Sequence, residues 1–319
     1  MKVGLLSTSS IAPRFLAALR ESGLGEAVAL SSRSAEKARE TAKRWGIPRA
    51  YGSHEELLRD PEVEVVYVST VNAAHYVWAR EALLHGKHVV CEKPCTTSPR
   101  ETAALFGLAA ERGLFLMEAQ KMLFLPAVLE VKRRLDRGDL GTVRMAELNH
   151  SFDGSYNAWM YDEAAGGGPL LSSAIYVVEL LQFLFGCSVA ECRGIRTVHP
   201  GANVEEQYVL AGRMENGVLF SAKNSTTAPL RDGAVFYGDR GRAELPDYWK
   251  ARRAVFVGRD GAQETAEFPC EHELIYEVRH IADCLNRGLL QSPVVTGEFS
   301  TRAIRTLEQI RADWISEKM

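Results

Sequence analysis

A short apolar run over residues 89–91 ends at an acid, a lysine and a proline, which are Glu92, Lys93 and Pro94. A β-branched run that is bounded by chain breakers is typical of a buried strand in a parallel sheet, and the proline ends the ladder. A lysine at the carboxyl end of such a strand lies where open α/β sheets bind their ligands, and the Glu92 carboxylate can hold its ammonium in place. The pattern favours a ligand site at Lys93. The alternative is a solvated Glu–Lys pair on a loop.

A serine-rich turn near the amino terminus is a second candidate site. Residues 7–12 read Ser-Thr-Ser-Ser-Ile-Ala, between a predicted strand at 2–6 and a predicted helix at 11–20. In a dinucleotide-binding fold this turn carries the fingerprint Gly-x-Gly-x-x-Gly/Ala, and its backbone N–H groups bind a pyrophosphate at the helix amino terminus. A serine hydroxyl can bond a phosphate oxygen, but serine tolerates positive φ poorly and adds a Cβ that faces the ligand. The alternative is a plain turn that caps a helix. The residues expected at the phosphates are Ser7, Ser9, Ser10 and Ile11.

The end of the second predicted strand bears on the choice of cofactor. Residues 26–30 are followed by Ser31, Ser32, Arg33 and Ser34, without the carboxylate that would bind a ribose 2′-hydroxyl. An arginine beside serines suits a 2′-phosphate, because a guanidinium makes charge-assisted hydrogen bonds to phosphate oxygens. Ser32 and Arg33 therefore favour NADP, with NAD as the alternative cofactor. An exposed arginine that opens a helix is the alternative interpretation of this pattern.

Strands and helices that alternate along the first part of the chain must position these residues. Apolar β-branched runs alternate with helical spacings of about ten to fifteen residues, which indicates parallel strands joined by right-handed crossovers. We therefore expect a dinucleotide-binding α/β domain over residues 1–118, built as a Rossmann doubly wound parallel sheet. Its predicted strands lie at 2–6, 26–30, 63–69, 87–91 and 114–117, and its predicted helices at 11–20, 35–45, 73–84 and 99–112.

Strands follow one another with few helices in the rest of the chain. We expect an α+β domain over residues 119–319, with a largely antiparallel, open-faced sheet and helices on one face. Pairing of subunits across the other face would make the protein a homodimer or a homotetramer. The C-terminal helix is the element that would pack back on the first domain. The predicted strands lie at 143–152, 188–198, 206–214, 218–226, 234–238 and 253–257, and the predicted helices at 126–137, 170–185, 271–287 and 300–316.

Composition argues against several classes of function. The 319 residues suit two domains, and the contents of 46% hydrophobic and 25% charged residues are those of an average globular protein. A formal net charge of -3 provides no basic field for a nucleic acid, and no apolar run approaches the roughly 20 residues of a membrane span. We therefore expect no nucleic-acid or membrane partner, and a cytoplasmic location because the amino terminus lacks the layout of a signal peptide. The six cysteines include no Cys-x-x-Cys pair, so we expect buried free thiols and no metal site.

Five blocks of sequence match one oxidoreductase family at the family's spacing. On these blocks the chain resembles the Gfo/Idh/MocA oxidoreductases, named for glucose-fructose oxidoreductase and inositol dehydrogenase, over essentially its whole length. The resemblance implies a nucleotide domain followed by an open-faced sheet, a nicotinamide held between them, and a sugar or cyclic alcohol as the substrate. It also implies that Thr70, Asn72, His75 and Glu92 lie beside the cofactor, with His75 holding loop geometry rather than transferring protons. The matching blocks are residues 46–53, 72–75, 86–94, 117–119 and 166–171.

The resemblance also implies a catalytic pair. In that family the lysine of the Glu-Lys-Pro block contacts the nicotinamide ribose and the substrate hydroxyl, and it maps to Lys93. An aspartate and, four residues on, a histidine or tyrosine follow the family's triple glycine, and these positions here are Ser172 and Tyr176. The tyrosine matches the branch of dihydrodiol dehydrogenase and xylose dehydrogenases, whereas the serine cannot replace the aspartate's charge. Hydride transfer needs a positioned acid or base at the substrate oxygen, which Tyr176 can supply when the Lys93 cation favours its phenolate form. Outside this context Tyr176 would be interpreted as a core tyrosine.

Loop residues before the triple glycine are candidates for the substrate pocket. Asp153 and Trp159 lie there, and together with Ser172 they are expected to contact the substrate. Surface-loop positions are the alternative for Asp153 and Trp159. A second departure from the family lies at residues 119–126, which contain no arginine and no histidine.

The sequence therefore predicts an NAD(P)-dependent dehydrogenase or reductase, preferring NADP, that acts on CH–OH groups. It would move hydride between the nicotinamide and a carbinol or carbonyl carbon of a sugar, a polyol or a cyclic diol. The alternative on the same fold is a catalytically weak or inactive dinucleotide-binding sensor or regulator, which the departures at Ser7, Ser9, Ser172 and Leu125 favour. A third reading is that the serine-rich turn leaves no nucleotide site.

Overall fold

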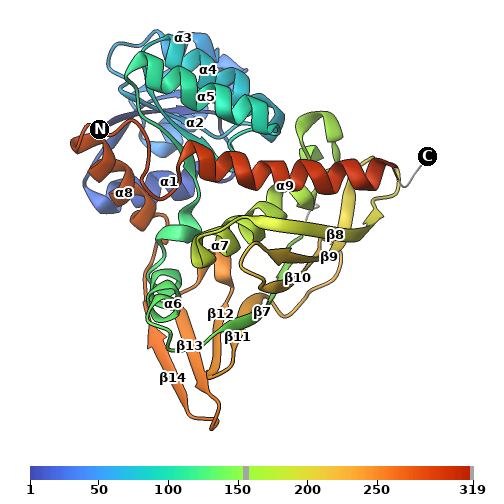
Figure 1. The fold of residues 1–319 in the computed structure, drawn as a ribbon. Helices are drawn as coiled ribbons and strands as arrows, with labels where there is room; N and C mark the ends of the chain where they lie inside the picture. Colours follow the sequence, from blue (N-terminus) through green and yellow to red (C-terminus); the bar gives the residue numbers. More distant parts are fainter. Residues whose placement is uncertain (154–157, 317–319) are drawn as a thin grey trace. The chain divides into compact units, whose positions relative to one another are not determined.

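The computed structural model describes residues 1–153 and 158–316, and the chain folds into two compact units, each with its own sheet (Figure 1). The first unit contains Met1–Gln120 and His272–Thr301. The second contains Lys121–Glu271 and the chain from Arg302 onward.

The first unit is built on a six-stranded sheet in which every neighbouring pair of strands is parallel. Its strands are β1 (Lys2–Leu6), β2 (Glu26–Ser31), β3 (Arg49–Tyr51), β4 (Val65–Val68), β5 (His88–Glu92) and β6 (Leu116–Ala119). Its helices are α1 (Ala12–Ser22), α2 (Ala35–Trp45), α3 (His54–Leu58), α4 (His75–Leu84), α5 (Pro99–Arg112), α8 (Ile275–Asn286) and the start of α9 (Gly297–Ser316), with a 3₁₀ turn η1 (Asn72–Ala74) before α4. β4 is buried along its whole length, because helices cover both faces of a parallel sheet. The predicted doubly wound sheet is confirmed.

The strand order of this sheet, β3-β2-β1-β4-β5-β6, reverses between β1 and β4. From β1 the chain passes to β2 and β3 on one side, and it then continues to β4, β5 and β6 on the other. Open α/β sheets bind ligands at such a reversal, in the crevice outside the carboxyl ends of the strands. The loops that follow β1 and β4 therefore lie where a ligand is expected.

Residues 272–301, which the sequence analysis assigns to the second domain, group with the first unit. α8 packs against α1, and Arg14 on α1 forms an ion pair with Glu273. The backbone N–H of Leu116, on the edge strand β6, donates to the carbonyl oxygen of Leu290 at 3.0 Å. These contacts join residues far apart in the chain, so local sequence patterns do not reveal them.

The second unit is built on an eight-stranded, mostly antiparallel sheet. Its strands are β7 (Val143–Ser151), β8 (Val189–Val198), β9 (Glu205–Met214), β10 (Leu219–Ser225), β11 (Gly233–Gly238), β12 (Gly241–Pro246), β13 (Arg253–Gly258) and β14 (Gln263–Glu267). Its main helices are α6 (Pro126–Asp136) and α7 (Ile175–Phe185), preceded by the π-helical turn η6 (Leu170–Ala174), and it includes the rest of α9. Along the order β14-β13-β12-β11-β7-β10-β9-β8 only β7 and β10 are parallel neighbours, which confirms the predicted α+β class. β12 and β14 are not predicted from the sequence, because both runs contain few β-branched residues.

The two faces of this second sheet differ in character. Core-facing residues such as Leu148 and Phe220 are buried. On the other face, Met145 pairs in register with Leu219 and Ile195 pairs with Val209, and these apolar side chains are exposed, Ile195 by 72%. We refer to the side that carries Met145, Ile195, Val209 and Leu219 as the open face.

One stretch of the described residues, Glu163–Phe185, is long and apolar enough to cross a membrane by length and composition alone. Of its most apolar window, 83% is buried within the protein, as is usual for a core helix. The sequence predicts a helix only over residues 170–185 of this stretch, because the glycines at its start interrupt the apolar run.

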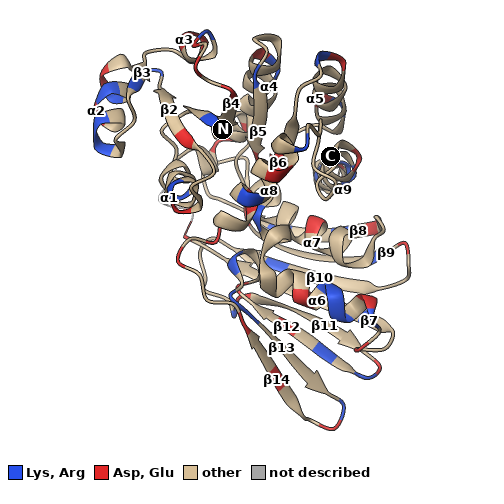
Figure 2. Cartoon of the chain, turned by 90° about the vertical axis from the view of Figure 1, so that its left-hand side faces the viewer, with Lys and Arg blue, Asp and Glu red and all other residues tan. Residues whose placement is uncertain are grey.

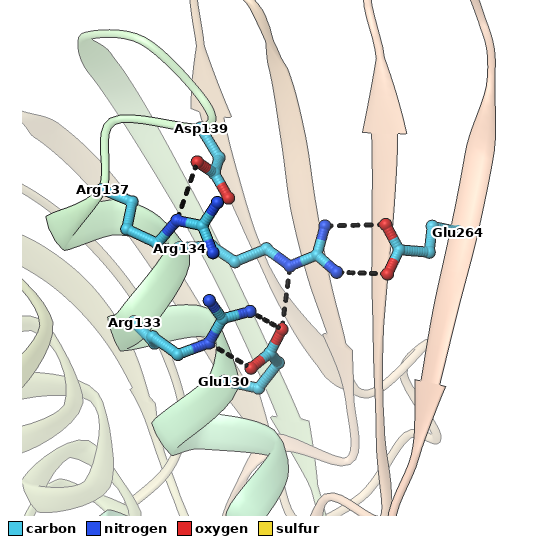
Figure 3. A network of polar contacts seen from close by, with 6 residues as sticks. All are labelled: Glu130, Arg133, Arg134, Arg137, Asp139 and Glu264. Carbon is cyan, nitrogen blue, oxygen red and sulfur yellow. Dashed lines mark hydrogen bonds and ion pairs between the residues drawn. The ribbon is translucent and has the colours of Figure 1, made fainter.

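An ion-pair network fastens α6 to β14 in the second unit (Figure 3). Arg134 on α6 binds both carboxylate oxygens of Glu264, and its Nε donates to Glu130 at 2.9 Å. Its guanidinium also lies 3.9 Å from the centre of the Phe256 ring on β13. Hydrogen bonding to Arg133 and then to Arg134 lowers the pKa of Glu130 to about 2.

Candidate active site

In the first unit the predicted cofactor residues lie at the carboxyl edge of the parallel sheet. Glu92 ends β5, and the others lie in the segments that follow β1, β2, β4 and β5; β1 and β4 flank the reversal of strand order. These residues are Ser7, Ser9, Ser10, Ile11, Ser32, Arg33, Thr70, Asn72, His75, Glu92 and Lys93. The fold thus brings the predicted cofactor residues together at the carboxyl edge of the six-stranded sheet.

The turn between β1 and α1 has a backbone conformation that is unusual for a residue with a side chain. Ser7 adopts a φ of 124°, in the region that favours glycine. α1 begins without a side-chain hydrogen bond at its N-cap, Ile11, and the backbone N–H of Ala12 donates to the Ser9 carbonyl oxygen at 3.3 Å. Ser9 Oγ donates to Ser69 Oγ at 2.9 Å, which ties this turn to the loop after β4. The place of a dinucleotide pyrophosphate at this turn stays a prediction.

The residues after β2 combine a buried hydroxyl with an exposed cation. Ser32 is buried, whereas Arg33 is exposed. Ser34 caps α2 by accepting a hydrogen bond from the Lys37 N–H, and α2 carries further lysines and arginines (Figure 2). Burial lowers the pKa of His54, and the nearby charge of Arg33 lowers it further. Positive charge at this end of the sheet suits a phosphate group.

His75 joins the loops after β4 and β5. Its ring is buried, with Nδ1 2.8 Å from the Pro94 carbonyl oxygen and Nε2 3.2 Å from the Thr70 carbonyl oxygen. Burial lowers the pKa of His75, although the Pro94 carbonyl and the Glu92 carboxylate act in the opposite direction. The ring therefore lies between the two loops, and a neutral imidazole donates to one of the two carbonyl oxygens because it carries a single N–H. Asn72 is buried beside it at the start of η1.

The loop that carries Lys93 is fixed from several sides. Tyr67 Oη donates to Glu92 Oε1 at 2.5 Å, and the Tyr67 ring stacks on Phe15 with centroids 3.9 Å apart. The backbone N–H of Cys95 donates to the buried carboxylate of Glu118 at 2.9 Å. Lys93 is half-buried at the end of β5. Its backbone is therefore anchored while its side chain remains at the carboxyl edge of the sheet.

In the second unit the triple glycine creates the start of the helix that carries Tyr176. A Cβ on Gly167 would lie 2.5 Å from the Met160 carbonyl oxygen, and one on Gly168 would lie 2.5 Å from Glu205 Oε1. Glu205 accepts the Leu170 N–H at 2.6 Å, so a buried carboxylate occupies the amino terminus of η6. Only glycine leaves room for this arrangement.

Ser172 and Tyr176 lie one turn apart at the junction of η6 and α7. The Ser172 hydroxyl donates to the Gly168 carbonyl oxygen at 2.9 Å, and Tyr176 is 8% exposed. Asp153 is exposed directly after β7, and Trp159 is half-buried in the short turn η4 (Ala158–Tyr161). Widened π turns are frequent at functional sites, and this one precedes the predicted acid/base.

Among the buried polar residues of the second unit are some that are not predicted from the sequence to matter for the site, including Ser173, His150, Asn224 and Tyr208. The last three lie at the core-facing positions of their strands, which the alternation of side chains along a strand could have revealed.

Among the residues that the structure describes, no group of three or more His, Cys, Asp or Glu side chains could hold a metal ion.

Two family matches cover most of the chain. Residues 1–120 match the GFO/IDH/MocA oxidoreductase family, described as an NAD-binding Rossmann fold, and residues 128–244 match the GFO/IDH/MocA C-terminal domain. A curated relative, trans-1,2-dihydrobenzene-1,2-diol dehydrogenase of Mus musculus, is 31% identical, with 98% of this chain and 96% of the relative covered.

Solved structures share the fold of the whole chain. KijD10, a 3-ketoreductase from Actinomadura kijaniata in complex with NADP and TDP-benzene, is 25% identical with a TM-score of 0.88, covering 98% of this chain and 97% of that one. A levoglucosan dehydrogenase in complex with NADH and levoglucosan is 18% identical with a TM-score of 0.87, covering 98% and 97%, and at that identity the likeness shows the fold alone.

Proposed function

The chain belongs to the GFO/IDH/MocA family of NAD-binding oxidoreductases, and we propose that it moves hydride between the nicotinamide of NADP and an oxygen-bearing carbon of a cyclic diol, a sugar or a polyol. The observation that carries this proposal is Lys93 at the carboxyl end of β5, on a loop anchored through Glu92, His75 and Glu118. A fixed cation at this edge is suited to hold a substrate oxygen.

The first unit supplies the cofactor contacts in this proposal. The turn of Ser7, Ser9, Ser10 and Ile11, with the amino terminus of α1, binds the pyrophosphate. Ser32 and Arg33 bind the 2′-phosphate, which makes NADP the preferred cofactor over NAD. When bound, the dinucleotide supplies or accepts the hydride. Thr70, Asn72, His75 and Glu92 shape the loops at the nicotinamide end.

Two side chains handle the reacting oxygen. In the oxidation direction Tyr176 takes the hydroxyl proton of the substrate, and in reduction it returns that proton to the forming alcohol. The Lys93 ammonium stabilises the negative charge that develops on the oxygen. With serine at position 172, Lys93 is the main fixed charge in this scheme. The other substrate contacts are assigned to Asp153, Trp159 and Ser172.

The relatives favour a diol or sugar as substrate. The curated relative is named for a cyclic trans-diol and is 31% identical over nearly the whole chain. The 3-ketoreductase, at 25% identity, was solved with NADP and TDP-benzene. We therefore rank cyclic diols and sugars as the first candidates, with NADP as the cofactor.

The open face supports an assembly of identical subunits. Exposed apolar side chains on adjacent strands, Met145 beside Leu219 and Ile195 beside Val209, are suited to pairing with a second copy. We propose a homodimer or a homotetramer formed through this face, acting in the cytoplasm on a small molecule. Sedimentation of the purified protein tests the assembly.

A fluorescence experiment tests the proposed activity. NADPH and NADH are titrated separately into the protein, and a panel of diones, aldoses and ketoses is then added to the reduced complex, with the reverse reaction followed on cyclic diols. The proposal expects tighter binding of NADPH and loss of nicotinamide fluorescence with at least one carbonyl substrate. Binding without turnover on any member would instead favour a sensor or regulator. Failure to bind either nucleotide would contradict both functions.

A further inference from the structure

A row of three polar side chains crosses the core-facing side of the second sheet. His150 on β7 is the register partner of Asn224 on β10, and Asn224 is the partner of Tyr208 on β9. All three are buried, and all three reach the hydroxyl of Ser173 on η6, which has no exposed surface. The distances to Ser173 Oγ are 2.7 Å from His150 Nδ1, 2.8 Å from Asn224 Nδ2 and 3.5 Å from Tyr208 Oη.

The hydrogen bonds at Ser173 show which of its neighbours donate to its hydroxyl oxygen. The Asn224 amide and the Tyr208 hydroxyl both donate to Ser173 Oγ, and burial raises the pKa of Tyr208, so its hydroxyl keeps its proton. A hydroxyl oxygen accepts two hydrogen bonds and donates one. The Ser173 hydroxyl thus has its own proton left to donate, and His150 Nδ1 lies 2.7 Å away as its partner. The row holds one hydroxyl in one orientation.

Such a row fixes the place of a helix more sharply than apolar packing can. The other buried residues of η6 are Leu170, Leu171 and Ala174, and apolar contact is non-directional, so it tolerates small slides and rotations. Directional hydrogen bonds in a low-dielectric core select one arrangement and are weakened by any other. Ser173 is thus the residue through which three strands fix the widened turn.

Tyr176 follows Ser173 by three residues, which places the two side chains on adjacent positions of the helix surface. Tyr248 is buried, and its ring centre lies 6.3 Å from that of His150. Burial raises the pKa of Tyr248, and the Tyr208 and Tyr176 hydroxyls raise it further. The start of the turn is held independently, by the hydrogen bond from Leu170 to Glu205. A helix start fixed at two points leads directly into the proposed acid/base.

We propose that Ser173 is a positioning residue, which holds the Tyr176 hydroxyl where it exchanges a proton with the substrate. This inference rests on the proposed role of Tyr176. Ser173 acts through the helix backbone, and His150, Asn224 and Tyr208 act through Ser173. A displacement of about 1 Å in a reacting group can lower turnover about 100-fold, so the effect of losing the row is large even though the overall fold is kept.

The test compares Ser173→Ala and the nearly isosteric Asn224→Leu with a matched control, Ser225→Ala. Ser225 is a buried serine next to Asn224 on β10, on the opposite side of that strand, and its hydroxyl accepts a hydrogen bond from Gln207 Nε2 at 3.0 Å. All three variants lose buried hydrogen bonds of the same sheet. A general loss of stability would therefore affect all three alike.

Hydrogen exchange provides a readout that needs no activity. Ser173→Ala and Asn224→Leu should speed exchange of the backbone amides of residues 170–176 at least about tenfold, because the turn then opens more often. Ser225→Ala should leave these amides as they are in the wild type. If the amides keep wild-type protection in both row variants, the proposal is overturned, whatever the enzyme's substrate.

Kinetics on the best substrate provide the second readout. Ser173→Ala and Asn224→Leu should lower kcat about 10- to 100-fold without changing the Kd for NADPH, whereas Ser225→Ala keeps kcat. In a Tyr176→Phe background, Ser173→Ala should cause no further loss, since residues that act as a unit are not additive. A wild-type kcat in Ser173→Ala, or a further loss in that background, would overturn the positioning role. Full activity of Tyr176→Phe alone would refute the proposed function, and this inference with it.

Discussion

Nδ1 of His75 lies 2.8 Å from the carbonyl oxygen of Pro94, so a buried imidazole at the start of α4 holds the residue that directly follows Lys93. The same ring reaches the Thr70 carbonyl oxygen with Nε2. His75 thus contacts the loops after β4 and β5 at the same time. The position of the Lys93 backbone therefore depends on a residue that is assigned no proton transfer in the proposed reaction. His75 links the stability of the first unit to the geometry of the proposed site.

The pKa values of four buried or half-buried histidines in the first unit lead us to expect a loss of stability in mild acid. Burial lowers the pKa of His75, and also those of His54, His88 and His280. Because the unfolded chain binds protons at a higher pH than the folded chain, the free energy of unfolding falls as the pH drops below about 6.5, the ordinary histidine value. Urea unfolding at about pH 7.5 and about pH 5.5 measures this difference. His75→Gln should reduce it, whereas the exposed His85→Gln should leave it unchanged; equal differences in both variants would contradict the assignment.

The strained turn residue Ser7 predicts a stabilising substitution. A side chain at a φ of 124° costs about 1–3 kcal/mol, and glycine removes that cost while adding about 0.5–1 kcal/mol of unfolded-state entropy. Ser7→Gly should raise the free energy of unfolding by about 1 kcal/mol and retain NADPH binding. Ser7→Val should lower both stability and NADPH affinity, because a β-branched side chain fits this backbone worse. Denaturant unfolding and NADPH titration measure both effects. Destabilisation by Ser7→Gly would show that the serine is not strained.

The proposed contact of Arg33 with the 2′-phosphate leads us to expect that this residue sets the preference for NADP over NAD. Arg33→Ala should weaken NADPH binding about 10- to 100-fold, the worth of charge-assisted hydrogen bonds to a phosphate, and leave NADH binding nearly unchanged. The control is Arg39→Ala, an exposed arginine further along α2, which should change neither affinity by more than about twofold. Isothermal titration with both cofactors gives the ratio. Equal weakening of NADPH and NADH by Arg33→Ala would remove the basis for preferring NADP.

The network around Arg134 predicts where the second unit loses stability (Figure 3). Arg134→Leu loses the bonds to Glu130 and Glu264 and the contact with the Phe256 ring, and it should cost about 1–2 kcal/mol. Arg137→Ala is the control, since that side chain is 62% exposed, and it should cost under about 0.5 kcal/mol. The pKa of Glu130 is lowered from its ordinary 4.5 to about 2. The stability that the ionised Glu130 contributes should therefore be lost as the pH falls from 4.5 to about 2, where the folded protein protonates this carboxylate. Urea unfolding of both variants near neutral pH checks the ranking, and equal costs would contradict it.

Local sequence patterns suffice for most of the fold. β1 (Lys2–Leu6) and α2 (Ala35–Trp45) begin and end where the sequence predicts, because β-branched runs and helical spacing are properties of neighbouring residues. Six strands of the second sheet, β7 to β11 and β13, lie within one residue of their predicted bounds at each end. β12 and β14 are missed because their sequences are polar, and pairing with neighbours, rather than propensity, makes them strands.

The residues of the candidate site also divide into those that local sequence patterns predict and those that they do not. Strand ends mark Ser7, Arg33 and Lys93 from the sequence, since the carboxyl edge of a parallel sheet collects them. The contacts that hold the site residues in place are between residues far apart in the chain, so they cannot be predicted from the local sequence. Position 168 must be glycine because the carboxylate of Glu205 leaves no room for a Cβ, and Glu205 lies 35 residues beyond Leu170, whose N–H it accepts. Likewise, the role of Ser173 depends on three strands that meet only in the folded sheet. The catalytic assignment of Lys93 and Tyr176 itself stays a prediction.

That assignment is tested most directly by steady-state turnover of Lys93→Ala and Tyr176→Phe on the best substrate, measured beside the Kd for NADPH. As a control, Tyr237→Phe removes only a tyrosine hydroxyl that bonds Glu147 at 3.0 Å. We predict that Lys93→Ala and Tyr176→Phe each lower kcat at least about 100-fold, the usual worth of a positioned acid/base or charge, while NADPH still binds and Tyr237→Phe remains active. Near wild-type turnover in both variants would contradict the proposed mechanism.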